Sequence, residues 1–177
     1  MAVPGRVMFA LLVALLLNVE IKGINFFRTV YYLPSIFGSS VAISIVWRFM
    51  FQKQGMVNEL LGLIGVPGVN WFGDPGKALI TICIIPIWQF GSSMVLFLAA
   101  LKNVPRSLYD SAQIDGAGKV SCFFSITLPM ISPIMLFNLV MQAIGCFQEF
   151  STAFVLTKGG PNKATFLYGI KIYREAF

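Results

Sequence analysis

The sequence contains no histidine and few charged residues. Of its 177 residues, 11% are charged and 57% are hydrophobic, and the mean hydropathy is +0.80. A soluble domain usually carries about 25% charged residues, so this composition indicates a chain that lies in lipid. The absence of histidine removes the commonest general base and metal ligand at neutral pH.

Cysteine is also scarce. The three cysteines, Cys83, Cys122 and Cys146, are odd in number and widely spaced. They offer neither metal-ligand spacing nor a disulfide framework. A G-x-x-x-x-G-K-[ST] phosphate-binding loop is absent as well. We therefore expect no catalytic residues, no metal, no cofactor and no nucleotide bound by this chain.

The net charge of +6 comes from thirteen Lys and Arg against seven Asp and Glu. The basic residues are scattered between apolar runs and form no patch, which excludes nucleic acid as a partner. Their distribution over the connecting segments is also too even to set the orientation of the chain in a membrane.

Long apolar runs are what the sequence has in abundance. The twenty-four residues from Ala78 to Leu101 carry no charge, and as a helix they would extend about 36 Å, enough to cross a bilayer. Pro86 and Gly91 should bend or loosen this helix. Three segments are long enough to span: Thr29–Phe51, Ala78–Leu101 and Leu128–Gln148. The fold class is therefore an all-α, polytopic membrane helical bundle.

The remaining segments are shorter. Val7–Leu17 would reach only about 16 Å as a helix, roughly half a bilayer core. A signal peptide is the alternative there, but no convincing cleavage site follows. Helical spacing predicts a short helix over Met56–Ile64, and Val69–Pro75 is typical of a turn with an aromatic anchor. We expect a Gly-Pro loop over Ser151–Lys163 and a short amphipathic helix over Ala164–Phe177.

A polar stretch, Tyr109–Pro133, interrupts the apolar sequence. Pro105 can start a helix, because its missing N–H would be unpaired there anyway. Gly116 can end that helix in a left-handed conformation. A second short helix should run from about Ala117 until Pro129 interrupts it. The stretch predicts a helix–turn–helix at a membrane surface.

This stretch resembles the cytoplasmic loop of ABC-importer permeases, which reads E-A-A, three residues, G, nine residues, then I-x-L-P. Asp110-Ser111-Ala112 stands for E-A-A, Gly116 for the glycine, and Ile126-Thr127-Leu128-Pro129 for the ending. Asp for Glu keeps the charge, and Ser for Ala keeps the small size. The residues that the resemblance assigns to this loop are Tyr109, Asp110, Ser111, Ala112, Asp115, Gly116, Ala117, Leu128 and Pro129.

The resemblance covers essentially the whole chain and implies one transmembrane permease domain, with its coupling loop over about residues 102–128. It implies a multi-pass protein of the cell inner membrane, whose loop docks on a separate ATP-hydrolysing subunit. A second, related permease and an extracytoplasmic solute-binding protein are further implied partners. The stretch Thr157–Thr165, with its Gly-Gly-Pro, resembles the maltose- and glycerol-phosphate-type carbohydrate permeases. Measured against that family, the chain would be cut at both ends.

Polar groups at membrane depth are candidate pathway residues, because they are costly unless they face protein or water. Asn138, Gln142, Cys146 and Glu149 fall on one helix face, together with Gly145. Trp88, Gln89, Ser92 and Ser93 cluster in the middle of the preceding span. The resemblance implies that these two helices line a sugar cavity. Helix–helix packing is the alternative reading of the same residues.

Two other classes of membrane protein remain open. A secondary transporter driven by an ion gradient usually needs a buried charged pair, and Glu149 near a helix end is poor support for one. A membrane scaffold without transport activity would explain the helices but not the polar loop.

Overall fold

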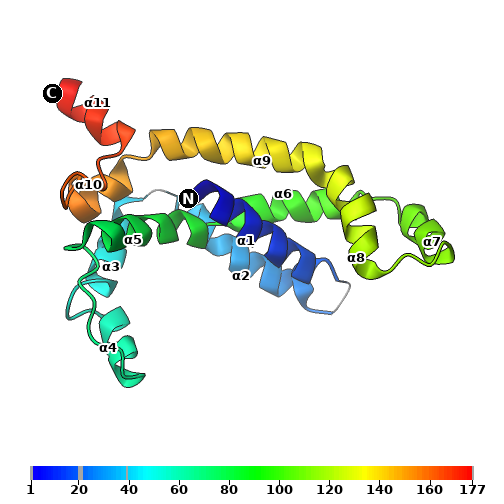
Figure 1. The fold of residues 1–177 in the computed structure, drawn as a ribbon, viewed down its shortest axis with the longest axis horizontal. Helices are drawn as coiled ribbons and strands as arrows, with labels where there is room; N and C mark the ends of the chain where they lie inside the picture. The colour runs from blue at the N-terminus through cyan, green and yellow to red at the C-terminus, as the bar shows by residue number, and fades with distance from the viewer. Residues whose placement is uncertain (1, 20–21, 39, 177) are drawn as a thin grey trace. The chain divides into compact units, whose positions relative to one another are not determined.

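The computed structural model describes residues 2–19, 22–38 and 40–176, and these form helices and no strand (Figure 1). The helices are α1 (Ala2–Leu17), α2 (Ile24–Ile36), α3 (Val41–Met50), α4 (Met56–Leu63), α5 (Pro75–Trp88), α6 (Gly91–Lys102), α7 (Arg106–Ile114), α8 (Lys119–Cys122), a π-helical turn (Phe123–Thr127), α9 (Leu128–Gln148), α10 (Ser151–Thr157) and α11 (Tyr168–Ala176). The all-α prediction is confirmed.

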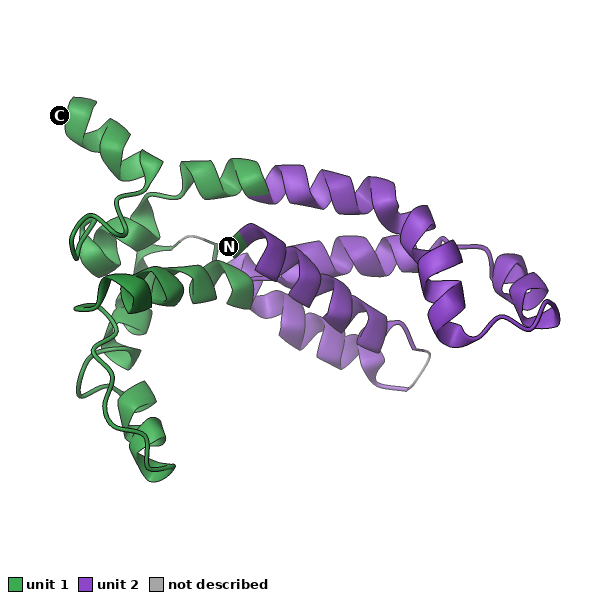
Figure 2. Cartoon of the chain, in the orientation of Figure 1, with its two compact units in different colours: residues 1–2, 37–88, 143–177 green, residues 3–36, 89–142 purple. Residues whose placement is uncertain are grey.

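The chain divides into two compact units (Figure 2). Unit 1 comprises residues 1–2, 37–88 and 143–177, and unit 2 comprises residues 3–36 and 89–142. This division was not predicted, because its boundaries fall inside apolar stretches and in α9.

Unit 2 is built on close packing of α1, α2 and α6. The buried residues of α1, Val7, Ala10, Ala14 and Leu17, recur at helical spacing and so form one face. They belong to the same hydrophobic core as Met94 and Phe97 of α6, which are 0% exposed. Burying a side chain such as Phe97 contributes about 1.5–3 kcal/mol when the exposed reference is water.

Gly91, the first residue of α6, allows the closest approach to α2. A Cβ atom built there would lie 2.6 Å from the Tyr31 carbonyl oxygen and 2.7 Å from the Tyr32 Cα. Only glycine fits that spacing without movement of the backbone. Phe90, just before it, packs edge-on against Phe9 of α1, with ring centroids 4.8 Å apart.

Unit 1 has a smaller core, formed by Ile82 and Ile85 of α5, Ala153 and Leu156 of α10, and Ile170 of α11. The connector between α3 and α5 is organised by the side chain of Asn58. Its Nδ2 donates to the Val69 carbonyl at 2.9 Å, and its Oδ1 accepts from the Val69 N–H and from Trp71 Nε1, both at 3.0 Å. The ring of Trp71 meets Phe51 edge-on. The predicted turn with an aromatic anchor is confirmed.

Two predicted spans are each divided into two helices. Thr29–Phe51 contains α2 and α3, which are separated at residues 37–40. Gly38 lies in the left-handed region, with φ +53°, and so ends the helical path there. Ala78–Leu101 contains α5 and α6, with a break at Gln89 and Phe90. The proline at 86 removes a backbone donor from the last turn of α5, so the expected loosening is confirmed.

By length and composition, the described residues contain one helix able to cross a membrane, Lys119–Gln148, or up to three spans if each bent pair counts as one. Ala2–Leu17 is apolar but short, as predicted.

Two further expectations were wrong. Pro129 does not interrupt the second helix of the polar stretch, because the helical path continues from Lys119 through Gln148. The wider π-helical turn Phe123–Thr127 ends two residues before this proline. In a regular α-helix the proline ring would lie against the carbonyl four residues back. The expected loop Ser151–Lys163 begins instead with the helix α10, whose Ala153 and Leu156 are buried.

Candidate functional site

The first helix predicted for the polar stretch is α7, and its end has a defined cap. The N–H of Gly116 donates to the Gln113 carbonyl at 3.0 Å, and the N–H of Ala117 donates to the Ala112 carbonyl at 2.8 Å. This pair of bonds is the Schellman motif, which requires a left-handed residue after the helix. Gly116 has φ +78°, so the role predicted for this glycine is confirmed.

A side-chain hydrogen bond joins the two helices of the polar stretch. The hydroxyl oxygens of Tyr109 in α7 and Thr127 in the π-helical turn are 2.8 Å apart. Thr127 is buried, and its Oγ1 also donates to the Cys122 carbonyl. A hollow of about 280 Å³ separates the helices beside this bond. The bond therefore fixes α7 against the start of the long helix.

The outward surface of this helix pair is partly apolar. Ile114 is 87% exposed and Val120 is 72% exposed. Asp110, Ser111, Asp115 and Gly116 are also exposed, whereas Tyr109, Ala112 and Ala117 are half-buried. Leu128 and Pro129 form the first turn of α9, and so are helical instead of ending a helix. The exposed surface of this helix pair therefore carries small and apolar groups.

Five of the predicted pathway residues lie in unit 2, and two of them pair. Gln142 Nε2 of α9 donates to Ser93 Oγ of α6 at 3.0 Å. Asn138, one turn earlier in α9, is 1% exposed, and its Nδ2 is buried without an acceptor. Gln89 is buried at the break between α5 and α6, and Ser92 is half-buried in the first turn of α6.

Sequence reasoning missed Arg6, which contacts two of these residues. Its Nη2 donates to the Gln89 carbonyl at 2.6 Å and to Ser92 Oγ at 3.3 Å. The Gln89 carbonyl lies at the break between α5 and α6, so the arginine donates to the backbone where the helix is interrupted. A lone basic residue in the otherwise apolar run of α1 was the signal that could have identified it.

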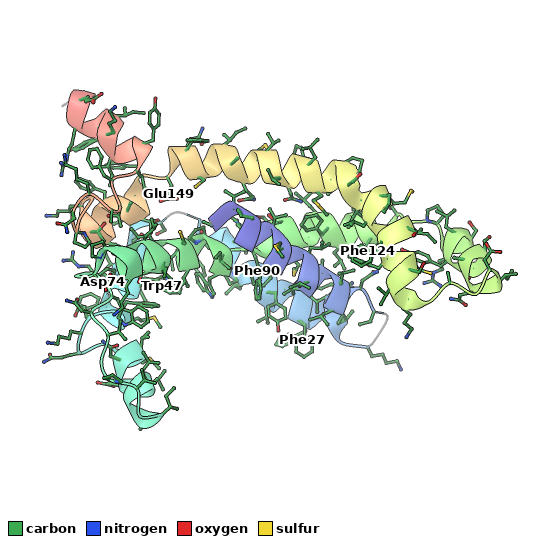
Figure 3. All side chains as sticks on the ribbon, in the orientation of Figure 1. Phe27, Trp47, Asp74, Phe90, Phe124 and Glu149 are labelled. Carbon is green, nitrogen blue, oxygen red and sulfur yellow. The ribbon has the colours of Figure 1, made fainter. Side chains whose placement is uncertain are left out.

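The other three predicted residues lie in unit 1. Trp88 packs against Trp47, with ring centroids 5.7 Å apart. Cys146 is exposed on α9. Glu149 lies at the junction of α9 and α10 (Figure 3), where its Oε1 accepts a hydrogen bond from the Thr152 N–H at 3.0 Å. This carboxylate stabilises the first turn of α10, a structural task that the sequence did not indicate.

Comparison with known proteins agrees with this architecture. The family model described as "binding-protein-dependent transport system inner membrane component" matches residues 1–177. The chain is 47% identical over 178 residues to the probable ABC transporter permease protein YesP of Bacillus subtilis, covering 99% of this chain and 58% of that protein. It is 36% identical to the sulfoquinovosyl glycerol transport system permease protein SmoG of Agrobacterium fabrum, over 98% of this chain and 56% of that protein.

Among solved structures, a bacterial ABC transporter involved in the import of the acidic polysaccharide alginate superimposes with a TM-score of 0.79 at 27% identity, covering 96% of this chain and 60% of the other. The chain thus spans between half and two thirds of the length of these relatives. The match over every residue, with the all-helical fold and the capped loop helix, shows that the chain belongs to the family of binding-protein-dependent transport system inner membrane components.

Proposed function

We propose that the chain forms part of the transmembrane subunit of an ATP-driven importer, with a carbohydrate or related polyol as its solute. The observation that carries this proposal is α7 with its Schellman cap, on the residues that match the E-A-A…G pattern. A rigid helix with the exposed Ile114 gives a second subunit a small apolar surface on which to dock. A plain polar connector would need no such cap.

The solute class is supported by the relatives and by the chemistry of the candidate pathway. Relatives are named for the transport of lactose and of sn-glycerol-3-phosphate. Amide and hydroxyl groups such as Gln142, Ser93 and Asn138 suit a neutral polyol, because they donate to and accept from sugar hydroxyls.

The partners in this proposal are a separate ATPase, a second permease subunit and an extracytoplasmic solute-binding protein. One solved relative is described as an alginate ABC transporter in complex with a periplasmic protein that holds an alginate pentasaccharide. ATP hydrolysis would belong to the ATPase subunit and not to this chain. The protein would be a multi-pass component of the inner membrane.

The test is uptake in proteoliposomes that contain the protein carrying this chain, its ATPase and its second permease. We expect labelled sugar to accumulate only with ATP inside and with binding protein outside. Ionophores that collapse proton and sodium gradients should leave uptake unchanged. Uptake that needs a gradient and not ATP would indicate a secondary transporter, and no uptake with an intact complex would favour a scaffold.

A further inference from the structure

A cationic cavity of about 640 Å³ lies in unit 2, where the ends of α1 and α6 approach the beginnings of α2 and α7. Ligand sites in proteins commonly have volumes of about 300–1,000 Å³. Three basic residues, Arg28, Lys102 and Arg106, line the cavity, and no acidic residue does so among the described residues. Glu20, which follows the lining residue Val19 in the sequence, lies outside the described residues. Arg28 and Lys102 therefore supply positive charge that suits an anion.

The guanidinium of Arg28 is held in place by neutral acceptors. Its Nη2 donates to the Leu17 carbonyl at 2.8 Å, and its Nη1 donates to Asn25 Oδ1 at 3.1 Å. Neither acceptor carries a charge, so the positive charge is fixed in position without being neutralised. A fixed cation at the edge of a partly apolar cavity is suited to a phosphate oxygen.

A second hollow, of about 570 Å³, shares Arg28 with the first. It runs between α2 and α6 and is lined on the α6 side by Val95, Leu96 and Leu98. Val95 and Leu96 are 42% and 40% exposed. On α2, Phe27 is also exposed, and it projects from the unit in Figure 3. An apolar groove thus begins at the residue that borders the cationic cavity.

We propose that the two hollows together hold one anionic phospholipid, with its phosphate in the cationic cavity and an acyl chain in the groove. A soluble phosphate would use the cavity but would have no use for the groove. Basic pockets between membrane helices are known to bind anionic headgroups. The apolar groove that continues from Arg28 is what favours a lipid over a soluble anion.

Bound lipid would also contact the helix that carries the coupling motif. Arg106 and Tyr109 of α7 line the same cavity, and Tyr109 bonds to Thr127. The lipid would therefore help to hold α7 in position. Its location in the cytoplasmic leaflet rests on the proposed function, whereas the binding site itself does not.

The experiment uses the protein carrying this chain, purified in nanodiscs that contain equal amounts of phosphatidylglycerol and phosphatidylcholine. Native mass spectrometry then measures which lipid stays bound. We expect phosphatidylglycerol to be retained selectively. Lys102→Gln and Arg28→Gln should each weaken its retention about fivefold, the usual effect of one basic residue near an anionic lipid. Lys102 is exposed, so its variant keeps the test valid if Arg28→Gln fails to fold.

Two further variants separate the sources of binding. Lys77→Gln removes an exposed lysine of α5 that does not line the cavity, and should leave retention unchanged. Val95→Asn should weaken lipid retention through the groove without affecting any binding of inorganic phosphate.

Three outcomes would overturn the proposal. Equal retention of the two lipids would remove the anionic requirement. Inorganic phosphate that binds as tightly as the lipid, with no effect of Val95→Asn, would make the cavity a site for a soluble anion. Unchanged lipid retention in Lys102→Gln, with loss of ATPase co-purification, would make the cavity a protein contact. Lipid retention is measured without transport, so failure here is distinct from failure of the proposed function.

Discussion

Gln142 of α9 donates a hydrogen bond to Ser93 of α6, two residues that are 49 positions apart in the sequence, with 3.0 Å between Nε2 and Oγ. This bond directs the polar face of α9 toward α6 within unit 2. Asn138, one turn earlier on the same face, is buried with an unpaired Nδ2. One amide on this face is therefore satisfied, and the other is buried without an acceptor, which is uncommon for buried polar groups.

We expect Gln142→Leu to reduce uptake roughly threefold to tenfold while assembly with the partner subunits stays intact. If Gln142 lines the proposed pathway, the variant loses one hydrogen bond to solute, worth about 0.5–1.5 kcal/mol. The measurement is the initial rate of uptake against solute concentration. Gln148→Leu, at the exposed end of α9, is the matched control and should behave as the parent does. Unchanged kinetics in Gln142→Leu would favour the packing alternative.

The second prediction concerns Gly116. Gly116→Arg should abolish ATP-coupled uptake and ATPase co-purification while the protein stays in the membrane. A Cβ atom at this position meets nothing within 4 Å, so the long side chain would project into the space that a docked partner needs. The positive φ adds strain for any L residue.

Two variants separate these causes. Gly116→Ala introduces the strain without the bulk, and we expect it to retain most co-purification. Gly118→Arg adds the same side chain two residues later, where the backbone has φ −75° and the space is also open. Normal co-purification of the ATPase with Gly116→Arg would contradict docking at this turn.

Local chemistry made α7 predictable, because Pro105, the small residues and Gly116 act within a few positions of one another. The helical pattern also predicted α4 and the length of α9. The breaks in the other two spans were only partly predictable, since a proline or glycine shows where a helix can break but not whether it does. Arg6 and Asn58 escaped sequence reasoning because their partners are distant in sequence or are backbone groups. A backbone carbonyl or N–H occurs in nearly every residue, so the sequence does not indicate which one a side chain will bond to.

The third prediction tests the arginine that the sequence did not identify as important. Arg6→Met should destabilise the protein by about 1–3 kcal/mol, because the hydrogen bonds from a charged donor to the Gln89 carbonyl and to Ser92 Oγ would be lost. Thermal unfolding in detergent measures the loss. Arg6→Lys keeps the charge and one donor and should recover part of the stability. Arg174→Met is the control. This exposed arginine donates to the Lys158 carbonyl, in the C-terminal part of the chain and away from Arg6. Equal midpoints for Arg6→Met and the parent would show that the bond is dispensable.

The fourth prediction concerns the approach of α2 to α6. Gly91→Ala should cost about 1–3 kcal/mol, the usual effect of adding a methyl group where backbone atoms cannot retreat. Gly62→Ala, in α4, adds the same group in open space and should leave stability unchanged or slightly raised. The measurement is the thermal midpoint of each variant compared with that of the parent. A Gly91→Ala protein as stable as Gly62→Ala would mean that the two helices have room to separate.

The last prediction concerns Asp74, which precedes α5 and is labelled in Figure 3. The pKa of its carboxyl lies below the ordinary value, mainly because the backbone N–H groups of Lys77 and Gly76 donate to it. Its Oδ1 lies 2.9 Å from the Gly76 nitrogen and 3.4 Å from the Lys77 nitrogen. Because the folded pKa is the lower one, the stabilisation is complete above the unfolded value of about 3.9 and is lost as pH falls through the folded value.

Asp74→Ala should therefore lower the thermal midpoint most at neutral pH, and the difference from the parent should shrink as the pH is lowered below about 4. Asp74→Asn keeps a side-chain oxygen acceptor but cannot ionise. Its thermal midpoint should therefore lie below that of the parent by a smaller amount, and this difference should also disappear on acidification. Lys77→Gln removes the exposed ion pair, 3.6 Å long, while it keeps both backbone donors, and we expect little change because exposed pairs contribute little. A deficit in Asp74→Ala that is constant from pH 7 to pH 3, or that grows on acidification, would show that the ionised cap does not stabilise α5.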